Sequence, residues 1–447
     1  MKIFSPALSR LARFRYWHIE HWVNNPIAAQ REVLQDLITH GQYTQFGRKY
    51  QFDNIFNIRT FKQTIPIHEY HDMKPYIDQV MEGEDSVLWN TPVKWFAKSS
   101  GTTSDKSKFI PLTEESIQDN HFQGSKDVLA LYYKTMPDSD LLTGKGLVIG
   151  GSHQVHPIKE DIQYGDLSAV LLQNAPFWAG LIRTPELSIA LMDEWEAKIE
   201  SLAQSTINED VTSIAGVPTW TLVLLKRILE LTEKKSIKEV WPNFELYIHG
   251  GVSFTPYKEQ FKKIIGADCN YLEIYNASEG FFAAQDNVKE EGMLLFLEHG
   301  IFYEFMPIEE YGKAQPMTVG LNKVVVGKNY AIVISTNGGL WRYLVGDTIQ
   351  FTNLAPYRIK VSGRLKQFIN AFGEELIADN SDKAMSETCT SFGVAIREYT
   401  AAPIYMSDNN SGAHEWLIEF ENEPADLKAF TIALDNNLKA ANSDYEA

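Results

Sequence analysis

The sequence predicts an α/β protein with a large N-terminal domain and a small, mobile α+β C-terminal domain. Three observations support this. Between about residues 144 and 275, short apolar strands alternate with helical segments, as in a parallel sheet covered by helices. After residue 290 the chain changes to short strands and turns, which indicates a β-rich subdomain. From about 358 a further strand–helix–strand–strand–helix order begins, which indicates a second domain.

Composition excludes several classes of protein. At about 150 residues per domain, the 447 residues allow two or three domains. The net charge of −17 argues against a nucleic-acid partner. No apolar run approaches the ~20 residues of a membrane span, so we expect no membrane association. Two cysteines, Cys269 and Cys389, cannot form a disulfide framework and suit the reducing cytoplasm.

The first element with clear start and stop signals is a helix over residues 25–41. Asn25 is placed to cap it, Pro26 stands at its first position and Gly41 ends it. The apolar residues that share one face of this helix are Ile27, Val33, Leu34, Leu37 and Ile38.

The region of alternating strands and helices begins with GKGLVIGGS, residues 144–152, a buried strand that ends in glycines. A long helix over about 186–204 follows from leucine, tryptophan and isoleucine residues at helical spacing. Pro218 opens the next helix. The remaining segments are the strand FELYIHGG, the helix TPYKEQFKKIIG and the strand NYLEIY. This alternation predicts a parallel sheet, and ligand sites in such sheets form at the carboxyl ends of the strands.

We assign residues 1–358 to the large domain, with a β-rich section at about 291–357 that we expect to form a small barrel. Its strands are MLLFLE, IFYEFM, KVVVG, YAIVIS and WRYLVGDTIQF. The small domain, 359–447, is predicted to contain the strand RIKVSG, a helix near 375–390, two strands and a helix over 425–441. The sequence stops at LKAANSDYEA without a closing element, so we expect this domain to be incomplete.

The stretch WFAKSSGTTSDKSKFIPLT, residues 95–113, is rich in small hydroxyl residues and glycine, with lysines on both sides. Hydroxyls, backbone N–H groups and lysines together suit a loop that holds a polyphosphate. The spacing of the common phosphate loop is absent. The alternative is an ordinary surface loop, since such residues are frequent in loops.

A second polar segment is EIYNASEGFF, residues 273–282. We expect a strand to end at Tyr275 and to deliver Glu279 into a loop. A carboxylate in that position can bind Mg²⁺, which commonly uses one or two carboxylates together with substrate phosphates. The alternative is a solvated loop glutamate.

Two further segments carry polar residues after apolar strands. In WRYLVGDTIQF, Asp347 can accept hydrogen bonds from both hydroxyls of a ribose, although Asp also stands frequently in plain turns. In VSGRLKQFINAFGEELI, Arg364 and Lys366 stand at the predicted domain junction, where the alternative is two surface bases on a tight turn.

In this order, the four segments resemble the adenylate-forming superfamily of acyl-CoA synthetases, peptide-synthetase adenylation domains and luciferases. The chain resembles more closely the auxin-responsive acyl-acid amido synthetase family and its bacterial members. That closer resemblance rests on SSGTTSDKSKF, YNASEGFF, HGGVSF and YLVGDTI, and it extends to YTQFGRKYQF, TIPIHEYHDMKPYI and IAGVPTW.

The resemblance implies roles for residues by position. Those that would hold the β- and γ-phosphates of ATP are Ser99, Ser100, Gly101, Thr102, Thr103 and Lys108. Those that would place the nucleotide and the acyl end are Tyr275, Asn276, Ala277 and Ser278. Those that would let the backbone lie against adenine are Gly250 and Gly251. Glu279 would bind Mg²⁺, Asp347 and Arg364 would hold the ribose, and Lys366 would lie near the hinge of the small domain.

The sequence departs from the family pattern at two points. Asp105 stands where the family often has glycine, and we expect its carboxylate to point to solvent. The family's small domain continues into a segment with a lysine that contacts the α-phosphate, and the sequence stops at Ala447 before it.

The resulting prediction is an ATP- and Mg²⁺-dependent ligase. A carboxylic acid attacks the α-phosphate of ATP, and an amine, which we expect to be that of an amino acid, then displaces AMP from the acyl adenylate. An acid–thiol ligase that uses CoA is the alternative enzyme, and a nucleotide-binding protein without turnover is the alternative of another class. The identity of the acid and the oligomeric state stay open.

Overall fold

The computed structural model describes residues 5–99, 108–151, 155–192, 194–266, 268–365, 376, 378–404, 413–442 and 445. For residues 5–9, 11–13, 178 and 403 the description covers the backbone alone. Within these residues the strands form sheets of eleven, four and two strands. The mixed α/β architecture confirms the predicted fold class.

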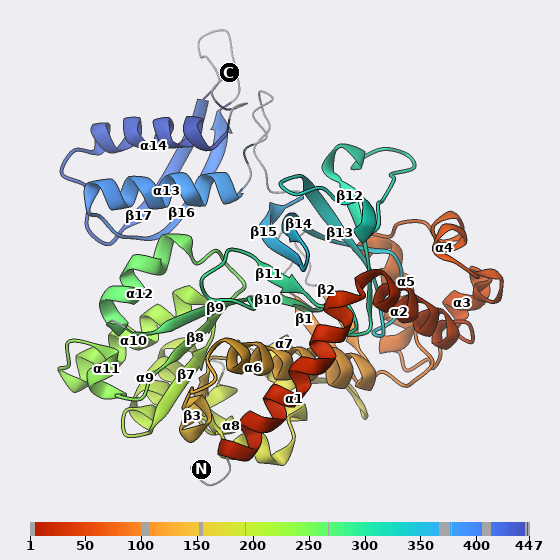
Figure 1. Cartoon of the computed structure of the whole chain (residues 1–447), viewed down its shortest axis with the longest axis horizontal. Coiled ribbons are helices and arrows are strands. Elements are labelled where there is room, and N and C mark those ends of the chain that lie inside the picture. The colour runs from red at the N-terminus through yellow and green to blue at the C-terminus, as the bar shows by residue number, and fades with distance from the viewer. Residues whose placement is uncertain are drawn as a thin grey trace.

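The largest sheet joins a parallel half to an antiparallel half (Figure 1), in the order β12-β13-β14-β15-β11-β10-β9-β8-β7-β3-β6. The parallel strands are β3 (Lys145–Val148), β6 (Arg183–Thr184), β7 (Val211–Ala215), β8 (Leu246–His249) and β9 (Asn270–Ala277). The antiparallel strands are β10 (Gly280–Ala284), β11 (Met293–Leu295), β12 (Ile301–Pro307), β13 (Asn329–Thr336), β14 (Tyr343–Leu354) and β15 (Tyr357–Arg364). The predicted parallel sheet is therefore present, but the β-rich section extends this sheet instead of forming a barrel.

Helices α9 (Trp195–Thr206), α10 (Pro218–Thr232), α11 (Ile237–Val240) and α12 (Lys258–Ile265) follow the parallel strands. Their apolar residues form one core with the sheet, in which Tyr247 of β8 stacks on Phe261 of α12 at 4.7 Å between ring centroids. Pro218 begins α10 as predicted, because proline at the first helical position lacks only an N–H that has no partner there anyway.

The four-stranded sheet has the order β2-β1-β5-β4. Its strands are β1 (Trp95–Ser99), β2 (Lys108–Leu112), β4 (His156–Lys159) and β5 (Ile162–Gly165). Between β2 and β3 lie the π-helical segment η2 (Ser116–Phe122) and α6 (Gln123–Thr135), and after β5 come α7 (Leu167–Asn174) and α8 (Leu187–Ala190). Phe96 of β1 shares one hydrophobic core with Leu246 of β8 and Leu272 of β9, so this sheet and the parallel strands belong to one molecular unit.

The N-terminal helices are α1 (Ser5–Asn24), α2 (Pro26–Gly41), α3 (Gln45–Lys49), α4 (Ile58–Thr64) and α5 (Tyr70–Met81). The predicted helix 25–41 is present as α2, with two corrections. Ile27 is 37% exposed, since the buried face is formed by Ala29, Leu34 and Leu37. Asn25 makes no capping bond, because its Nδ2 donates to the carbonyl of His21 at 3.0 Å.

Three predicted elements were wrong. The helix over 186–204 is two helices, α8 and α9, because Glu194 caps a new start by accepting from the backbone N–H groups of Glu196 and Ala197. KVVVG forms no strand; Val326 makes only an isolated bridge to Phe351. RIKVSG belongs to β15, which pairs with β14 and β11 of the large sheet and not with the small domain.

The small unit contains α13 (Ala378–Phe392), β16 (Ile396–Ile404), β17 (Ala413–Phe420) and α14 (Leu427–Ala441). Figure 1 shows it, in blue, above α10 and α12. Gln260 of α12 donates to the carbonyl of Ile396 at 3.0 Å, Tyr257 donates to the carbonyl of Arg397 at 3.1 Å, and Lys226 of α10 pairs with Glu421. The small unit is therefore docked on the helices that cover β8 and β9.

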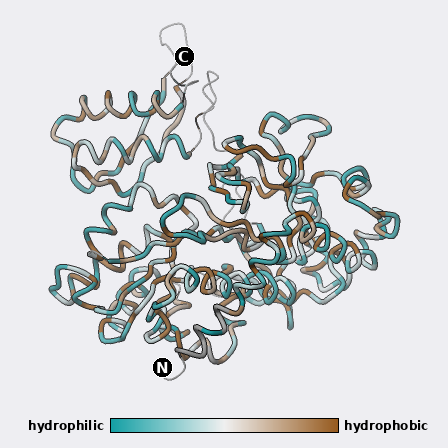
Figure 2. Tube along the Cα trace, viewed as in Figure 1, coloured by the Kyte–Doolittle hydropathy of each residue, from teal (hydrophilic) through white to brown (hydrophobic). Residues whose placement is uncertain are grey.

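Hydrophobic residues follow the strands through the middle of the large unit, while hydrophilic residues gather at the outer turns (Figure 2). Among the described helices, none is long and apolar enough to cross a membrane.

Candidate active site

The parallel strands β3, β7, β8 and β9 end at one edge of the large sheet. Glycines follow the first three of them, at Gly150, Gly216 and Gly250, and β9 continues into a hairpin with β10. Polar groups brought to this edge meet there because parallel strands share their direction.

The hairpin places Glu279 at its tip. β9 runs on to Ala277, which pairs with Gly280, so only Ser278 and Glu279 form the turn. The predicted strand end at Tyr275 was therefore two residues early. Tyr275 and Asn276 belong to the strand, and their side chains are held by the ladder and not by a loop.

Groups from three other strands, β2, β14 and β15, act on the Glu279 carboxylate. Enclosure by the protein and the like charge of Asp347 raise its pKa to about 7, against the opposing charges of Lys108 and Arg364. Tyr343 lies beside it, and burial followed by the charge of Glu279 raises the pKa of this tyrosine well above its usual value. The protein therefore holds an acidic group whose charge it does not fully compensate.

Asp347 and Arg364 lie directly opposite each other in the ladder between β14 and β15. Arg364 Nε is 3.3 Å from one carboxylate oxygen of Asp347, and the hydroxyl of Tyr275 donates to the other at 2.7 Å. The predicted ribose-binding pair is thus brought together, and Tyr275 of β9, which is separated from β14 by three strands in the sheet order, donates to its carboxylate.

The predicted phosphate loop joins two paired strands. Ser99, the last residue of β1, is opposite Lys108, the first residue of β2. Lys108 Nζ lies 5.8 Å from the ring centroid of Tyr70, whose hydroxyl accepts from the backbone N–H of Phe109 at 2.8 Å. The predicted site residues that lie outside the described residues are Ser100, Gly101, Thr102, Thr103 and Lys366, and Asp105 lies outside them too.

Gly250 and Gly251 have different physical reasons to be glycine. A Cβ on Gly250 would lie 2.4 Å from the carbonyl oxygen of Ile274 in β9, so the strands themselves require glycine there. Gly251 has a φ of +84°, a conformation that other residues rarely adopt. Both stand beside β9, at the same edge as the hairpin.

Sequence reasoning missed three residues of this site. Tyr343 lies in the same motif as Asp347, and its position in the strand offered a signal. Asn120 and His121 lie in η2, far from any motif. Asn120 Oδ1 accepts from the N–H of Phe281 at 2.7 Å, and its Nδ2 donates to the carbonyl of His299 at 2.9 Å, so it anchors the hairpin from behind.

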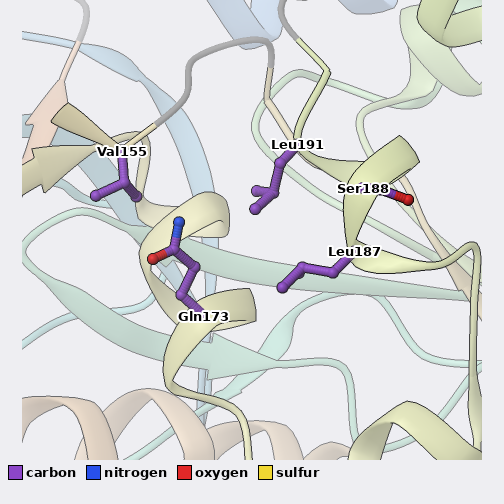
Figure 3. A pocket seen from close by; sticks show the side chains of 5 residues that line it. All are labelled: Val155, Gln173, Leu187, Ser188 and Leu191. Atoms are coloured by element: carbon purple, nitrogen blue, oxygen red, sulfur yellow. The ribbon is translucent and has the colours of Figure 1, made fainter.

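A cavity of about 310 Å³ lies near the end of β3, between α7 and α8 (Figure 3). It is lined by Val155, Gln173, Leu187, Ser188 and Leu191. Leu187 and Leu191 project toward Gln173 of α7, which gives an uncharged and mainly aliphatic lining. Side chains of α7 and the backbone of α8 approach Gly150, so the cavity opens beside the carboxyl edge of the parallel strands.

The chain matches three domains of one family. Residues 15–269 match the GH3 family N-terminal domain, residues 294–364 the GH3 family central domain and residues 379–447 the GH3 family C-terminal domain.

Curated relatives agree with these matches. The chain is 24% identical to the indole-3-acetic acid-amido synthetase GH3.2 of Arabidopsis thaliana, over 86% of this chain and 82% of that protein. It is 27% identical to the jasmonoyl–L-amino acid synthetase JAR4 of Nicotiana attenuata, over 72% of this chain and 66% of that protein. Both relatives are named for joining an acid to an amino group.

Solved structures show the same fold. The AtGH3.15 acyl acid amido synthetase in complex with 2,4-DB superimposes with a TM-score of 0.80 at 17% identity, covering 96% of this chain and 84% of that one. A 2-hydroxyisobutyryl-CoA ligase in its postadenylation state gives 0.60 at 12% identity, covering 93% and 82%. The fold is thus that of adenylate-forming enzymes. Since the matched domains together span most of residues 15–447, the chain belongs to the GH3 family.

Proposed function

We propose that this protein activates a carboxylic acid with ATP, as an acyl adenylate, and transfers the acyl group to an amine, with an amino acid as acceptor. The observation that carries the proposal is the enclosure of Glu279 between Lys108 and the Asp347–Arg364 pair, at the carboxyl edge of the parallel strands. Family membership supports the reaction type, since the matched relatives are amido synthetases.

The described residues suit distinct tasks in the first step. Lys108 supplies positive charge beside Ser99 at the base of the predicted phosphate loop. Asp347 presents carboxylate oxygens as acceptors for ribose hydroxyls, and Tyr275 and Arg364 keep that carboxylate in one orientation. Gly250 and Gly251 leave a flat backbone surface beside them for adenine. Positioning of this kind is the main way that a protein accelerates attack on a phosphoryl group.

The donor set at the hairpin fits Mg²⁺. Glu279 offers a carboxylate at the tip of the hairpin, beside Lys108 and the Asp347–Arg364 pair. Hard oxygen donors of this type are the ligands that Mg²⁺ takes, with phosphate oxygens completing its shell. When bound, Mg²⁺ would neutralise phosphate charge, and Glu279 would hold it.

The cavity between α7 and α8 is proposed to receive the hydrocarbon part of the acid. Its volume of about 310 Å³ and its aliphatic lining suit a small apolar group, since ligand pockets run from about 300 to 1,000 Å³. Its position beside Gly150, at the carboxyl edge of the parallel strands, supports this part of the proposal. The acid itself is not specified by these features.

An amine acceptor is favoured over CoA because the matched relatives are named as amido synthetases, whereas the CoA ligase shares only the fold. The free thiols Cys269 and Cys389 support a cytoplasmic setting.

The test is acid-dependent ATP–pyrophosphate exchange over a panel of carboxylic acids, followed by mass analysis of products after amino acids or CoA are added. Glu279→Gln is expected to reduce exchange by about 10²–10³-fold, the usual effect of removing one electrostatic contact. Glu160→Gln is the matched control, because Glu160 also lies in a two-residue hairpin turn, between Lys159 and Ile162, but is exposed.

Two outcomes would contradict the proposal. ATP binding without exchange for any acid would indicate a binding protein, and equal loss in both glutamate variants would show that Glu279 has no special role. A thioester product in place of an amide would assign the protein to the CoA ligases.

A further inference from the structure

The π-helical segment η2 brings two consecutive polar residues into the interior. Its buried residues are Ser116, Ile117, Asn120 and His121, at the wide spacing of a π-helix. Single π-helical turns inside α-helices occur frequently at functional sites. Asn120 has a structural explanation, since it holds the backbone of the β9–β10 hairpin. Among the described residues, no comparable backbone contact explains why the His121 side chain is buried.

His121 is 1% exposed and lies beside the side chain of Asn276. Asn276 stands near the end of β9, just before the hairpin turn formed by Ser278 and Glu279. Burial lowers its pKa to about 4, against the opposing effect of Asn276, so the ring is neutral at physiological pH. A neutral imidazole has one N–H donor and one bare acceptor nitrogen. One neighbouring side chain can satisfy only one of them.

Two polar atoms of this pair lack hydrogen-bond partners within the described residues. They are Nδ1 of His121 and Oδ1 of Asn276, and both are buried. Leaving a buried polar atom unpaired is unfavourable, so such atoms in native proteins call for a partner. These two unpaired atoms lie beside the hairpin that carries Glu279, where the proposed function puts the substrates.

We propose that His121 is a positioning residue for the reaction. Its ring orients the Asn276 side chain toward the substrates, and binding of ATP and the acid completes the hydrogen bonds of the pair. This inference rests on the proposed function. It assigns to η2 a role in substrate positioning that no sequence motif in this segment predicts.

The kinetic test compares three variants with the natural protein in acid-dependent pyrophosphate exchange. His121→Phe keeps the ring shape without nitrogen and is expected to lower kcat about 10–100-fold. His121→Gln, whose amide reaches the position of Nε2, is expected to recover most of that loss. Gln118→Ala, on the exposed face of the same segment, is the control and is expected to be unchanged. Wild-type kcat in His121→Phe, or equal losses in the Phe and Gln variants, would overturn the proposal.

A second measurement does not depend on turnover. In protein labelled with ¹⁵N-histidine, the signals absent from His121→Phe identify the His121 ring. Addition of ATP and Mg²⁺ with an acid is expected to shift its nitrogen resonances, and unchanged resonances at saturating ATP would overturn the proposal. If exchange fails in the natural protein but the resonances shift, the proposed function is wrong while the role of His121 in ligand binding stands.

Discussion

At the scale of single residues, the site is organised around a carboxylate that the protein keeps incompletely neutralised. Glu279 has Lys108 and Arg364 nearby, yet enclosure and Asp347 still raise its pKa to about 7. A group in this state gains from a bound cation, because the cation removes the unfavourable charge. Glu279 is therefore expected to contribute to the pH dependence of the stability of the metal-free protein, and the difference between the natural protein and Glu279→Gln isolates that contribution.

The sign of that dependence follows from the pKa values. In the unfolded chain a glutamate titrates near 4.5, whereas the folded protein holds the proton up to about 7. The folded state therefore binds more protons in this window, and the free energy of unfolding falls as pH rises from about 4.5 to about 7. Chemical denaturation of chelator-treated protein at pH 5.5 and 7.5 measures this. Glu279→Gln should raise the free energy of unfolding above that of the natural protein, and this increase should be larger at pH 7.5 than at pH 5.5. An equal increase at both pH values would refute the assignment.

The site residues differ in how far the sequence predicts them. Glu279, Asp347 and Arg364 stand in motifs, so the family resemblance predicts roles for them. Their mutual contacts could not be predicted, because the opposition of Asp347 and Arg364 depends on strand register and the Tyr275–Asp347 bond joins residues 72 positions apart. His121 carries no local signal at all, since its burial depends on how η2 meets the hairpin.

At the scale of elements, the side chain of Asn120 joins η2 to the β9–β10 hairpin by hydrogen bonds. Its amide makes contacts of 2.7 Å with the N–H of Phe281 and 2.9 Å with the carbonyl of His299. Asn120→Ala should lower the free energy of unfolding by about 2–3 kcal/mol, because these buried backbone groups lose their partner. Thermal or denaturant unfolding measures it. Gln118→Ala, on the exposed face, should change the free energy of unfolding by no more than about 0.5 kcal/mol. An equal decrease in both variants would show that the effect is not specific to the Asn120 hydrogen bonds.

The cavity between α7 and α8 gives an element-scale prediction about substrate size. Leu191→Trp should fill part of the space and raise KM for bulky acids at least about tenfold, while short acids are affected little, since their hydrocarbon part needs less room. Exchange rates over acids of increasing size measure this. Leu231→Trp, on the partly exposed surface of α10, serves as the control. An equal rise of KM for all acids would argue against the cavity as the acid site.

The elements themselves were predicted well where local pattern decides them. β3, β8, β9 and α10 carry clear periodicity and start signals, and each is present. The break between α8 and α9 was missed because apolar spacing continues through it, while the side chain of Glu194 caps a new helix. β15 was assigned to the wrong sheet because the sequence pattern of a strand does not identify its partner.

At the scale of the whole molecule, the small unit rests on the large one through few polar contacts. The ion pair of Lys226 and Glu421 joins α10 to the residue that follows β17, and Lys360 of β15 lies 2.7 Å from Asp379 of α13. Interfaces built from such contacts permit domain rotation. If the proposed two-step reaction is accompanied by rotation of the small domain, as the predicted hinge at Lys366 implies, these contacts define one of its positions.

Charge reversal tests this docking. Glu421→Lys places two positive groups together and should shift the population away from the observed arrangement, which small-angle X-ray scattering of the free protein would detect. The ratio of amide formation to pyrophosphate exchange should change with it. The double variant Lys226→Glu with Glu421→Lys should restore both readouts, and a failure of restoration would show that the pair does not hold the domains.

The position of the Asp347–Arg364 rung has a mechanical consequence. Arg364 ends β15, and the N–H of Leu365 donates to the Gly346 carbonyl at 2.7 Å just beyond it, on the side from which the chain continues toward the small unit. Once the contacts that dock the small unit are broken, a force that pulls on it is transmitted through the chain to the C-terminal end of β15. We then expect β15 to separate from β14 starting at this rung. A ribose bound to Asp347 would stabilise the strand pair at which separation begins. The force needed to start separating β15 from β14 should therefore rise when nucleotide is bound.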